Sequence, residues 1–467
     1  MAFTSGLTPG VLWRLMSLVG TQRASASRVP ACGCGWLRLP GTHAVGGGDV
    51  SPFDSSAWTI EHRCTQCGAP INLEETDRFF ACPFCRVKMC LTTTDCFRYY
   101  LPAPDTATPG IFYVPYWRIK GMAFSCDGDY EVRESLLDAT HRASEDLLFP
   151  KSLGLRPQAL KLRFVTSETG ANFVKPSMAF DAAFSEIQAA LPLCTQADQP
   201  TGPFYSTFVG EQVSIVYAPF YIRENVVFDG ILGEPLHSTR LVKDFIPARE
   251  TADGAVKILP ALCPNCGADL DGGRESIGFF CTNCNSCWYL TGNSLERIPF
   301  SVMPDVDSDS VHLPFWRIKV RFQVIDLESF ADLVRMANLP RVIKREWESQ
   351  VLFFYVPAFK VNAGLLLRIA RMFTINQPQD TTETDAPPAQ PYPITFPAHE
   401  AAESIKVIIA TLMAMKKKLW PTLKDVNIFP TESCLVYMPF RRQGQDLIYS
   451  PMRFSVSVNS LKYGEHL

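Results

Sequence analysis

The sequence lacks the features that mark membrane proteins and polyanion-binding proteins. In 467 residues no apolar run is long enough to cross a bilayer. The best candidate, Ile405 to Met415, is too short, contains Lys406 and is followed by three further lysines. The formal net charge is only −3, so no basic excess indicates a polyanion as partner. We therefore expect a soluble, cytoplasmic protein.

Recognisable catalytic motifs are also missing. The chain contains no G-x-S-x-G, no phosphate-binding loop, no H-E-x-x-H and no dinucleotide fingerprint. There are only seven histidines. His62 precedes a cysteine pair and His312 precedes Pro314, but neither recurs in the other half of the chain, so we expect packing or surface roles for both. These absences favour a protein that is not an enzyme.

Acidic residues are absent from the first 48 positions, where four arginines lie among small residues. Such a composition is compatible with an organellar targeting peptide. An unstructured tail, or a start codon assigned too far upstream, is favoured because the helical pattern that a targeting peptide needs is weak. We expect residues 1–58 to be a disordered or mis-started tail, and we assign no role to Cys32 and Cys34 within it.

Cysteine, in contrast, is abundant. Eight of the sixteen cysteines form four C-x-x-C pairs. These are Cys64 with Cys67, Cys82 with Cys85, Cys263 with Cys266, and Cys281 with Cys284. This spacing is typical of metal knuckles, in which one tight turn directs two sulfurs at one ion. Free thiolates of this kind favour a reducing compartment.

The two sets of four cysteines are related by a shift of 199 positions. The same shift carries Trp117-Arg118-Ile119-Lys120 to Trp316-Arg317-Ile318-Lys319. Further along, residues 216–220 resemble residues 436–440 with a shift of 220. The sequence therefore predicts an internal duplication. A Pro- and Thr-rich segment, 377–397, accounts for the extra length and is expected to be an exposed, extended loop.

Hydrophobic periodicity completes the predicted architecture, an α+β fold in which each half is a four-cysteine zinc ribbon followed by a β-rich domain with packed helices. Strands are expected at 111–119 and 311–324, and helices at 178–191, 327–337 and 400–419. The predicted domains are ribbon 1 at 59–97, an α+β domain at 98–246, ribbon 2 at 258–297 and an α+β domain at 298–467. The boundary between the halves is expected within 247–260, and the halves are expected to pack as a pseudo-dimer.

The cysteine motifs resemble the zinc-ribbon family. Cys263-Pro264-Asn265-Cys266-Gly267-Ala268 is similar to a typical ribbon knuckle, and Cys64-Thr65-Gln66-Cys67-Gly68-Ala69 repeats it. The ribbon followed by a Pro-aromatic-Trp strand is also similar to poorly characterised bacterial ribbon proteins. The resemblance covers about sixty to seventy residues. It implies two structural Zn²⁺ ions, each held by four cysteines: Cys64, Cys67, Cys82, Cys85 and Cys263, Cys266, Cys281, Cys284.

Other interpretations of the cysteines remain open. The pairs are compatible with disulfides, with iron in a rubredoxin-like site, and less naturally with an iron–sulfur cluster. Cys287 competes with Cys281 and Cys284 as a ligand, although Lys88 stands at its equivalent position in the first half. Cys90 and Cys96 have no counterpart, and Cys126, Cys194 and Cys434 are expected to be buried.

A closed shell of four thiolates leaves no position for substrate, so these sites are predicted to be structural. The function we expect is protein interaction or assembly, as a scaffold with protein partners. A nucleic-acid-associated factor is an alternative that charge disfavours, because eight thiolates and two zinc ions would change −3 to −7. An iron-thiolate electron-transfer protein is another alternative. The candidate binding surface comprises Trp117, Arg118, Lys120, Trp316, Arg317 and Lys319.

Overall fold

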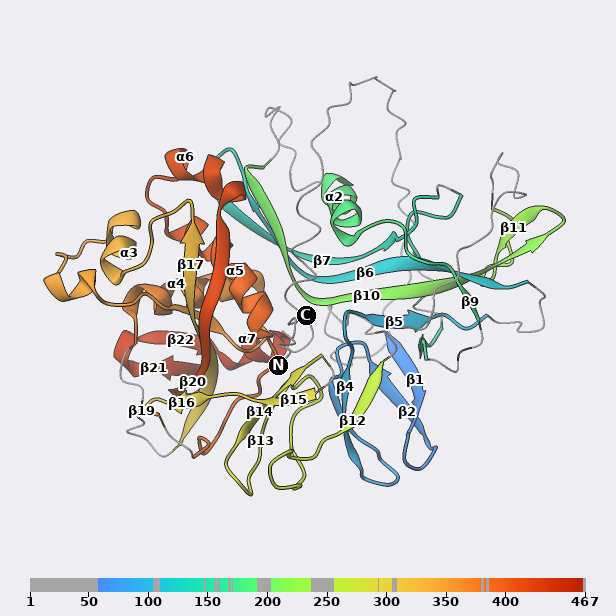
Figure 1. Cartoon of the computed structure of the whole chain (residues 1–467), viewed down its shortest axis with the longest axis horizontal. Helices are drawn as coiled ribbons and strands as arrows, with labels where there is room; N and C mark the ends of the chain where they lie inside the picture. The colour runs from blue at the N-terminus through green and yellow to red at the C-terminus, as the bar shows by residue number, and fades with distance from the viewer. Residues whose placement is uncertain are drawn as a thin grey trace, which may run out of the picture. The chain divides into compact units, whose positions relative to one another are not determined.

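The computed structural model describes residues 58–464 with gaps at 104–109, 147, 155–156, 158–159, 167–168, 170, 191–202, 237–255, 293, 305–308, 379–381 and 384–385 (Figure 1). The predictions for residues 1–57, including Cys32 and Cys34, lie outside the described residues. So do Cys194 and most of the predicted boundary between the halves. No helix among the described residues is both long and apolar enough to span a membrane.

The fold is mixed α+β and consists mostly of strands (Figure 1). The first cysteine region contains β1 (Thr59–Arg63), β2 (Pro70–Glu74), β3 (Phe79–Ala81) and β4 (Lys88–Thr92). The second contains β12 (Lys257–Pro260), β13 (Gly278–Phe280), β14 (Cys287–Thr291) and β15 (Ser294–Arg297). A larger sheet follows each of these regions along the chain.

The first large sheet has the strand order β7-β6-β10-β5-β8. Its strands are β5 (Phe97–Tyr100), β6 (Phe112–Cys126), β7 (Val132–Arg142), β8 (Arg163–Phe164) and β10 (Tyr205–Arg223), with β9 (Asn172–Phe173) beside β6 and β11 (Val226–Asp229) beside β10. Long apolar and aromatic runs in β6 and β10 explain why these two central strands are buried over most of their length.

The second large sheet has the order β18-β17-β20-β16-β19. Its strands are β16 (Phe300–Val302), β17 (Ser310–Gln323), β18 (Phe354–Pro357), β19 (Thr382–Glu383) and β20 (Asn427–Gln443), with β21 (Asp446–Tyr449) beside β20 and β22 (Phe454–Ser457) beside β21. The predicted strands at 111–119 and 311–324 correspond to β6 and β17, and β6 continues seven residues further than predicted.

The central strand pairs of the two sheets have the same register. Pro115 of β6 pairs with Tyr217 of β10, and Pro314 of β17 pairs with Tyr437 of β20. Pro115 and Pro314 are 199 positions apart, and Tyr217 and Tyr437 are 220 positions apart. These are the two shifts that relate the halves in sequence. Both sheets also have a short strand parallel to the long return strand, β5 beside β10 and β16 beside β20.

Each recurring tryptophan ties its sheet to a helix. The indole N–H of Trp117 donates to the carbonyl of Met178 at 2.9 Å, just before α2 (Phe180–Ala190). The indole N–H of Trp316 donates to the carbonyl of Phe396 at 2.8 Å, just before α5 (Ala398–Leu412). Each tryptophan is therefore fixed by the start of the helix that covers its strand.

The remaining helices whose bounds the structure describes lie in the second half. They are α3 (Phe330–Met336), η4 (Arg345–Glu348), α4 (Ala363–Asn376), α6 (Lys416–Leu419), η5 (Trp420–Asp425), η6 (Ser450–Met452) and α7 (Val458–Gly464). The predicted helices at 178–191 and 327–337 correspond to α2 and α3. Ser329 and Asp332 form a capping box that starts α3. The predicted helix at 327–337 therefore begins three residues later than expected.

The single helix predicted at 400–419 is wrong in its second part. The helix α5 ends at Leu412, Met413 is extended, and the lysines that follow form the separate short helix α6. A tertiary hydrogen bond explains the break, because the N–H of Ala414 donates to the carbonyl of Met336 at 3.1 Å instead of continuing the helix. The apolar face predicted for this helix is buried, with Ile405 and Ile408 fully covered.

The segment predicted to be an exposed loop at 377–397 is extended but only partly exposed. Ile394 and Phe396 are both buried. The N–H of Ile277 donates to the carbonyl of Ile394 at 2.9 Å, and the N–H of His312 donates to that of Gln390 at 2.9 Å. The described residues of this segment form no helix, but these tertiary bonds place Ile394 and Gln390 against the core rather than in solvent.

Candidate metal centres

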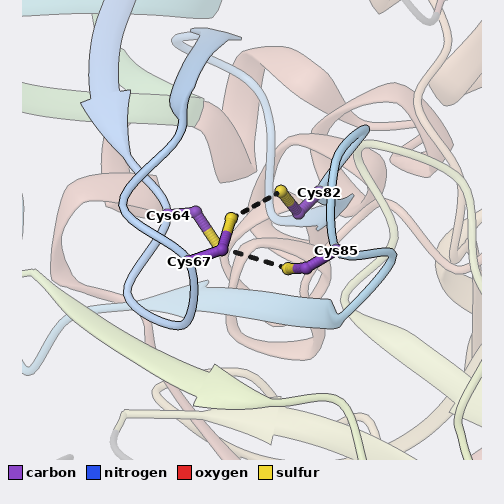
Figure 2. Close-up of side chains that lie close together, drawn as sticks. All are labelled: Cys64, Cys67, Cys82 and Cys85. Atoms are coloured by element: carbon purple, nitrogen blue, oxygen red, sulfur yellow. Dashed lines mark hydrogen bonds between the residues drawn. The ribbon is translucent and has the colours of Figure 1, made fainter.

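Two knuckles form the first cysteine cluster, and each positions its sulfurs with the same local hydrogen bonds. In the first knuckle the N–H of Cys64 donates to the carbonyl of Ala69, and the N–H of Gly68 donates back to that of Cys64, both at 2.9 Å. In the second knuckle the N–H of Cys82 donates to Val87, and that of Arg86 donates to Cys82, again at 2.9 Å. Figure 2 shows the two knuckles directing their four sulfurs at one another.

The second cluster repeats this arrangement. The N–H of Gly267 donates to the carbonyl of Cys263, and that of Asn285 donates to the carbonyl of Cys281, both at 2.8 Å. Each of the four knuckles closes on a residue with positive φ: 72° at Gly68, 63° at Arg86, 74° at Gly267 and 54° at Asn285. Glycine adopts this left-handed conformation without strain, which explains the glycine after the first pair of each cluster.

The four sulfurs of each cluster are spaced for one tetrahedral ion. All lie within 4.8 Å of one another. Cross-knuckle Sγ–Sγ distances are 3.7 Å for Cys64–Cys85 and for Cys67–Cys82. They are 3.6 Å for Cys263–Cys284 and 3.4 Å for Cys266–Cys281. A tetrahedron with metal–sulfur bonds of about 2.3 Å has sulfurs about 3.8 Å apart, so both clusters are able to hold a metal ion.

Disulfides do not account for these distances. A disulfide bond is about 2.05 Å long, whereas the sulfurs here are more than 3 Å apart, and all eight cysteines are free. In each cluster two cysteines are buried, one is half-buried and one is exposed. The exposed members are Cys67 and Cys266, so each cluster lies at the surface of its cysteine region.

Amide and hydroxyl donors stabilise the thiolate form of individual ligands. The backbone N–H of Cys85 is the largest influence on Cys82 and helps to lower the pKa of its thiol to about 6. The side-chain amide of Asn265 and then the hydroxyl of Ser286 lower the pKa of Cys284 to about 6. Hydrogen bonds to a thiolate favour the charged form, which is the form that binds metal.

A polar relay supports the second cluster and has no counterpart in the first. The indole N–H of Trp288 donates to Ser286 Oγ at 2.7 Å, and this oxygen lies 3.0 Å from Cys284 Sγ. Because the oxygen already accepts from the indole, its own hydrogen is available to the sulfur. Val87 and Met89 occupy the equivalent positions of the first cluster, where neither side chain has a hydrogen to donate.

The other described cysteines lie outside both clusters. Cys287, which competed with Cys281 and Cys284 as a ligand in the sequence, is 1% exposed and packs into the core of the second half. Cys90 is buried where the two cysteine regions meet, and Cys126 is buried as predicted. Cys434 is only half-buried, although the sequence predicted that it would be buried.

The two cysteine regions are joined by a shared sheet. The strand β12, at the start of the second region, pairs antiparallel with β4 of the first, whereas the corresponding strand β1 pairs with β2 of its own region. In the second region the matching edge of β14 is covered by β15, which follows in the same chain segment. The third strand of the first region's sheet, β12, therefore comes from the second half of the chain. The third strand of the second region's sheet, β15, comes from the second region itself.

Charged and apolar contacts reinforce this junction. The guanidinium of Arg274 donates to both carboxylate oxygens of Asp77, at 2.8 Å through Nε and 2.5 Å through Nη2. The carbonyl of Arg274 accepts from the N–H groups of Arg78 and Phe79. Beneath these bonds the rings of Phe79 and Phe279 are 5.5 Å apart. Sequence reasoning missed this junction because the charged pair is 197 residues apart.

The first-half members of the candidate binding surface are buried or half-buried. Arg118 is 1% exposed and forms a bidentate ion pair with Glu75, with distances of 2.9 and 3.2 Å, and a second pair with Asp138. Lys120 is buried beside the same glutamate, and Trp117 is half-buried. Burial by itself would lower the pKa of Arg118, but the two carboxylates raise it. These charges connect the first cysteine region to its sheet instead of facing solvent.

The second-half members also pack inward. Trp316 is 3% exposed, and Arg317 and Lys319 are half-buried. The guanidinium of Arg317 lies 4.9 Å from the ring centroid of Phe353. In this structure the six residues therefore do not form one continuous exposed basic surface.

The two histidines near recurring motifs have packing environments. His62 is half-buried with its ring edge-on to Phe164 at 5.5 Å, and burial lowers its pKa. His312 is 5% exposed and lies between Gln390 and Tyr392 through backbone hydrogen bonds. Neither lies in a group of metal-ligating side chains within the part of the chain that the structure describes.

We also compared the chain with protein-family models, with curated proteins and with solved structures, and none of the three comparisons returned a match. The class of protein is therefore defined by the fold and the sites themselves: an α+β chain with two four-cysteine clusters that have the pattern of zinc-ribbon sites.

Proposed function

We propose that this is a non-catalytic zinc protein whose two metal-held ribbons serve as a scaffold for other proteins. The observation that carries the proposal is the closed donor set, in which four cysteine sulfurs surround each site within 4.8 Å of one another. A tetrahedral ion held by four thiolates has no position left for water or substrate. Zinc suits such a role because it binds thiolates strongly and has no redox chemistry.

We further infer that the two halves arose by duplication of one ribbon-plus-sheet unit. The equal registers of Pro115–Tyr217 and Pro314–Tyr437 support this inference. So do the matching indole bonds of Trp117 and Trp316, each of which goes to a carbonyl two residues before the first residue of a helix. Independent origins would not be expected to reproduce the same offsets in strand pairing and in helix attachment.

Elemental mass spectrometry with an absorption spectrum tests the metal assignment. We expect two zinc ions per chain and no visible absorption band. Cys64→Ser is expected to lose the ion of its own cluster, whereas Cys287→Ser, which changes a buried cysteine outside both clusters, is expected to retain both. Iron with a visible band would replace the scaffold by an electron-transfer protein. Full metal content in Cys64→Ser would show that the ligand assignment is wrong.

An exposed apolar tip on the first cluster supports the scaffold role. Phe84, within the knuckle Cys82-Pro83-Phe84-Cys85, is 66% exposed, and Pro83 beside it is also exposed. An aromatic side chain held by a metal knuckle loses little freedom when a partner covers it, which favours binding. The equivalent residue of the second cluster is the polar Asn283, so the first cluster is the proposed contact surface.

Site-specific photo-crosslinking tests this contact. A benzophenone amino acid at position 84 is expected to give discrete protein crosslinks in cells. The same probe at Leu136, which is 58% exposed but lies on β7, serves as the matched control. Crosslinks that disappear on nuclease treatment would favour the nucleic-acid alternative. Identical patterns from positions 84 and 136 would remove the first cluster as the contact surface.

A further inference from the structure

The excursion between β17 and β18 has no counterpart in the first half. β6 is followed directly by its partner β7, with only residues 127–131 between them. β17 reaches its partner β18 only after residues 324–353, which include α3 and η4. The first sheet forms the equivalent pairing without this excursion. Pairing of the strands therefore does not explain why the second half contains it.

The excursion ends in an exposed tip that combines cations with apolar side chains. Val342 is 89% exposed, the highest value among the large exposed apolar residues of the described chain. Arg341, Lys344 and Arg345 beside it are exposed, as are Arg371 and Met372 of α4. We call these six residues, Arg341, Val342, Lys344, Arg345, Arg371 and Met372, the basic tip.

The excursion is anchored to the rest of the second half. The guanidinium of Arg341 donates to the carbonyl of Ile375 at 3.2 Å and to the side chain of Asn376 at 2.8 Å, at the end of α4. Asn376 in turn donates to the carbonyl of Met372 at 2.9 Å, which connects the two parts of the basic tip. Trp347 packs edge-on to Phe330, with the ring centroids 5.0 Å apart. The tip is therefore presented on a fixed base.

Few carboxylates balance the cations of the basic tip. The run from Leu339 to Arg345 contains three cations and no acidic residue. Glu346 follows it, and Glu348 is ion-paired with Arg335, which also pairs with Asp332 at 3.0 Å. Because charges separated by more than about 8 Å are screened at physiological salt, this local excess acts independently of the net charge of the whole chain.

We propose that the basic tip binds the surface of an anionic phospholipid bilayer, with Val342 entering the interface and the surrounding cations contacting lipid phosphates. Charge complementarity and the position of the apolar residue carry the proposal. A bilayer offers phosphates and, just beneath them, an apolar layer that an exposed side chain between cations is able to reach. Nucleic acid would pair with the cations but offers no equivalent apolar layer to Val342.

Vesicle flotation with the full-length, metal-loaded chain tests the proposal. We expect binding to phosphatidylcholine vesicles that contain roughly 30% phosphatidylserine, and little binding to phosphatidylcholine alone. Lys344→Ala and Arg345→Ala are each expected to weaken binding about fivefold, and binding is expected to fall as salt is raised. Val342→Asp is expected to abolish it.

The matched control is Leu136→Asp, which places the same charge at another exposed apolar residue of the first half. Circular dichroism and metal content establish that each variant is folded. Equal binding of Val342→Asp and Leu136→Asp would overturn the proposal. So would equal affinity for vesicles with and without phosphatidylserine, or salt-sensitive capture of a DNA duplex in place of vesicles.

Discussion

Ser286 is the residue that most clearly distinguishes the two metal centres. Its hydroxyl lies between the indole of Trp288 and the sulfur of Cys284, so a buried donor and a ligand sulfur are satisfied by one side chain. The first cluster has Val87 in this position. Hydrogen bonds from a second layer of residues to the ligands of a metal commonly change its affinity about 10- to 100-fold.

We therefore predict that Ser286→Ala accelerates loss of metal from the second cluster. A chelator competition that follows metal release spectroscopically is expected to show one slow and one faster site in the wild type. In Ser286→Ala the slow site is expected to exchange about 10- to 100-fold faster. Thr65→Ala, which removes a hydroxyl beside Met89 in the first cluster, is the control. An unchanged slow site in Ser286→Ala would contradict the proposed role of the relay.

At the scale of elements, strand β12 connects the two cysteine regions. The N–H of Ala261 donates to the carbonyl of Lys88 at 3.0 Å. In an antiparallel pair of strands, hydrogen-bonded and non-hydrogen-bonded positions alternate. Leu259, opposite Cys90, is therefore also at a hydrogen-bonded position, while Ile258, opposite Leu91, is not. Pro260 occupies another position where no ladder donor is needed.

Leu259→Pro is accordingly predicted to weaken the first cluster although it changes the second half of the chain. Proline at position 259 removes the N–H that faces β4, and loss of one such hydrogen bond costs about 1 kcal/mol. We expect earlier release of the first metal in denaturant titrations monitored by metal content. Ile258→Pro places the same residue one position away, where its N–H faces away from β4, and is expected to have a smaller effect. Equal effects of the two substitutions would indicate that β12 is not a structural part of the first region.

At the scale of the whole molecule, the hydrophobic core of the second half also includes residues of the first half. Met122, Phe124 and Val209, at the far ends of β6 and β10, belong to the hydrophobic core of the second half. Hydrogen bonds cross the same junction, where Gly210 donates its N–H to Glu400 at 2.9 Å and Lys416 donates to the carbonyl of Tyr130 at 2.9 Å. Disturbance of either half is therefore expected to reach the other through packing as well as through β12.

The metal-ligand set could be predicted from the sequence alone, because the ligands of each site come from two local turns. A C-x-x-C pair determines its own knuckle geometry through hydrogen bonds over a few residues, as at Cys64 and Gly68. The shift of 199 positions likewise predicted that a second four-cysteine cluster would repeat the first. The strands around Trp117 and Trp316 could be predicted for the same reason, since alternation and aromatic content are local properties.

Tertiary structure alone decided what the charged residues of those strands do. Arg118 was assigned to the candidate binding surface, but a carboxylate 43 residues away, Glu75, forms an ion pair with it in the interior. In the same way a hydrogen bond to Met336 ends α5 before the lysines, and β12 pairs with β4 of the first cysteine region instead of with a strand of its own region. Each of these outcomes depends on a partner distant in sequence, and local periodicity contains no information about which distant group will satisfy a buried charge, a free N–H or an open strand edge.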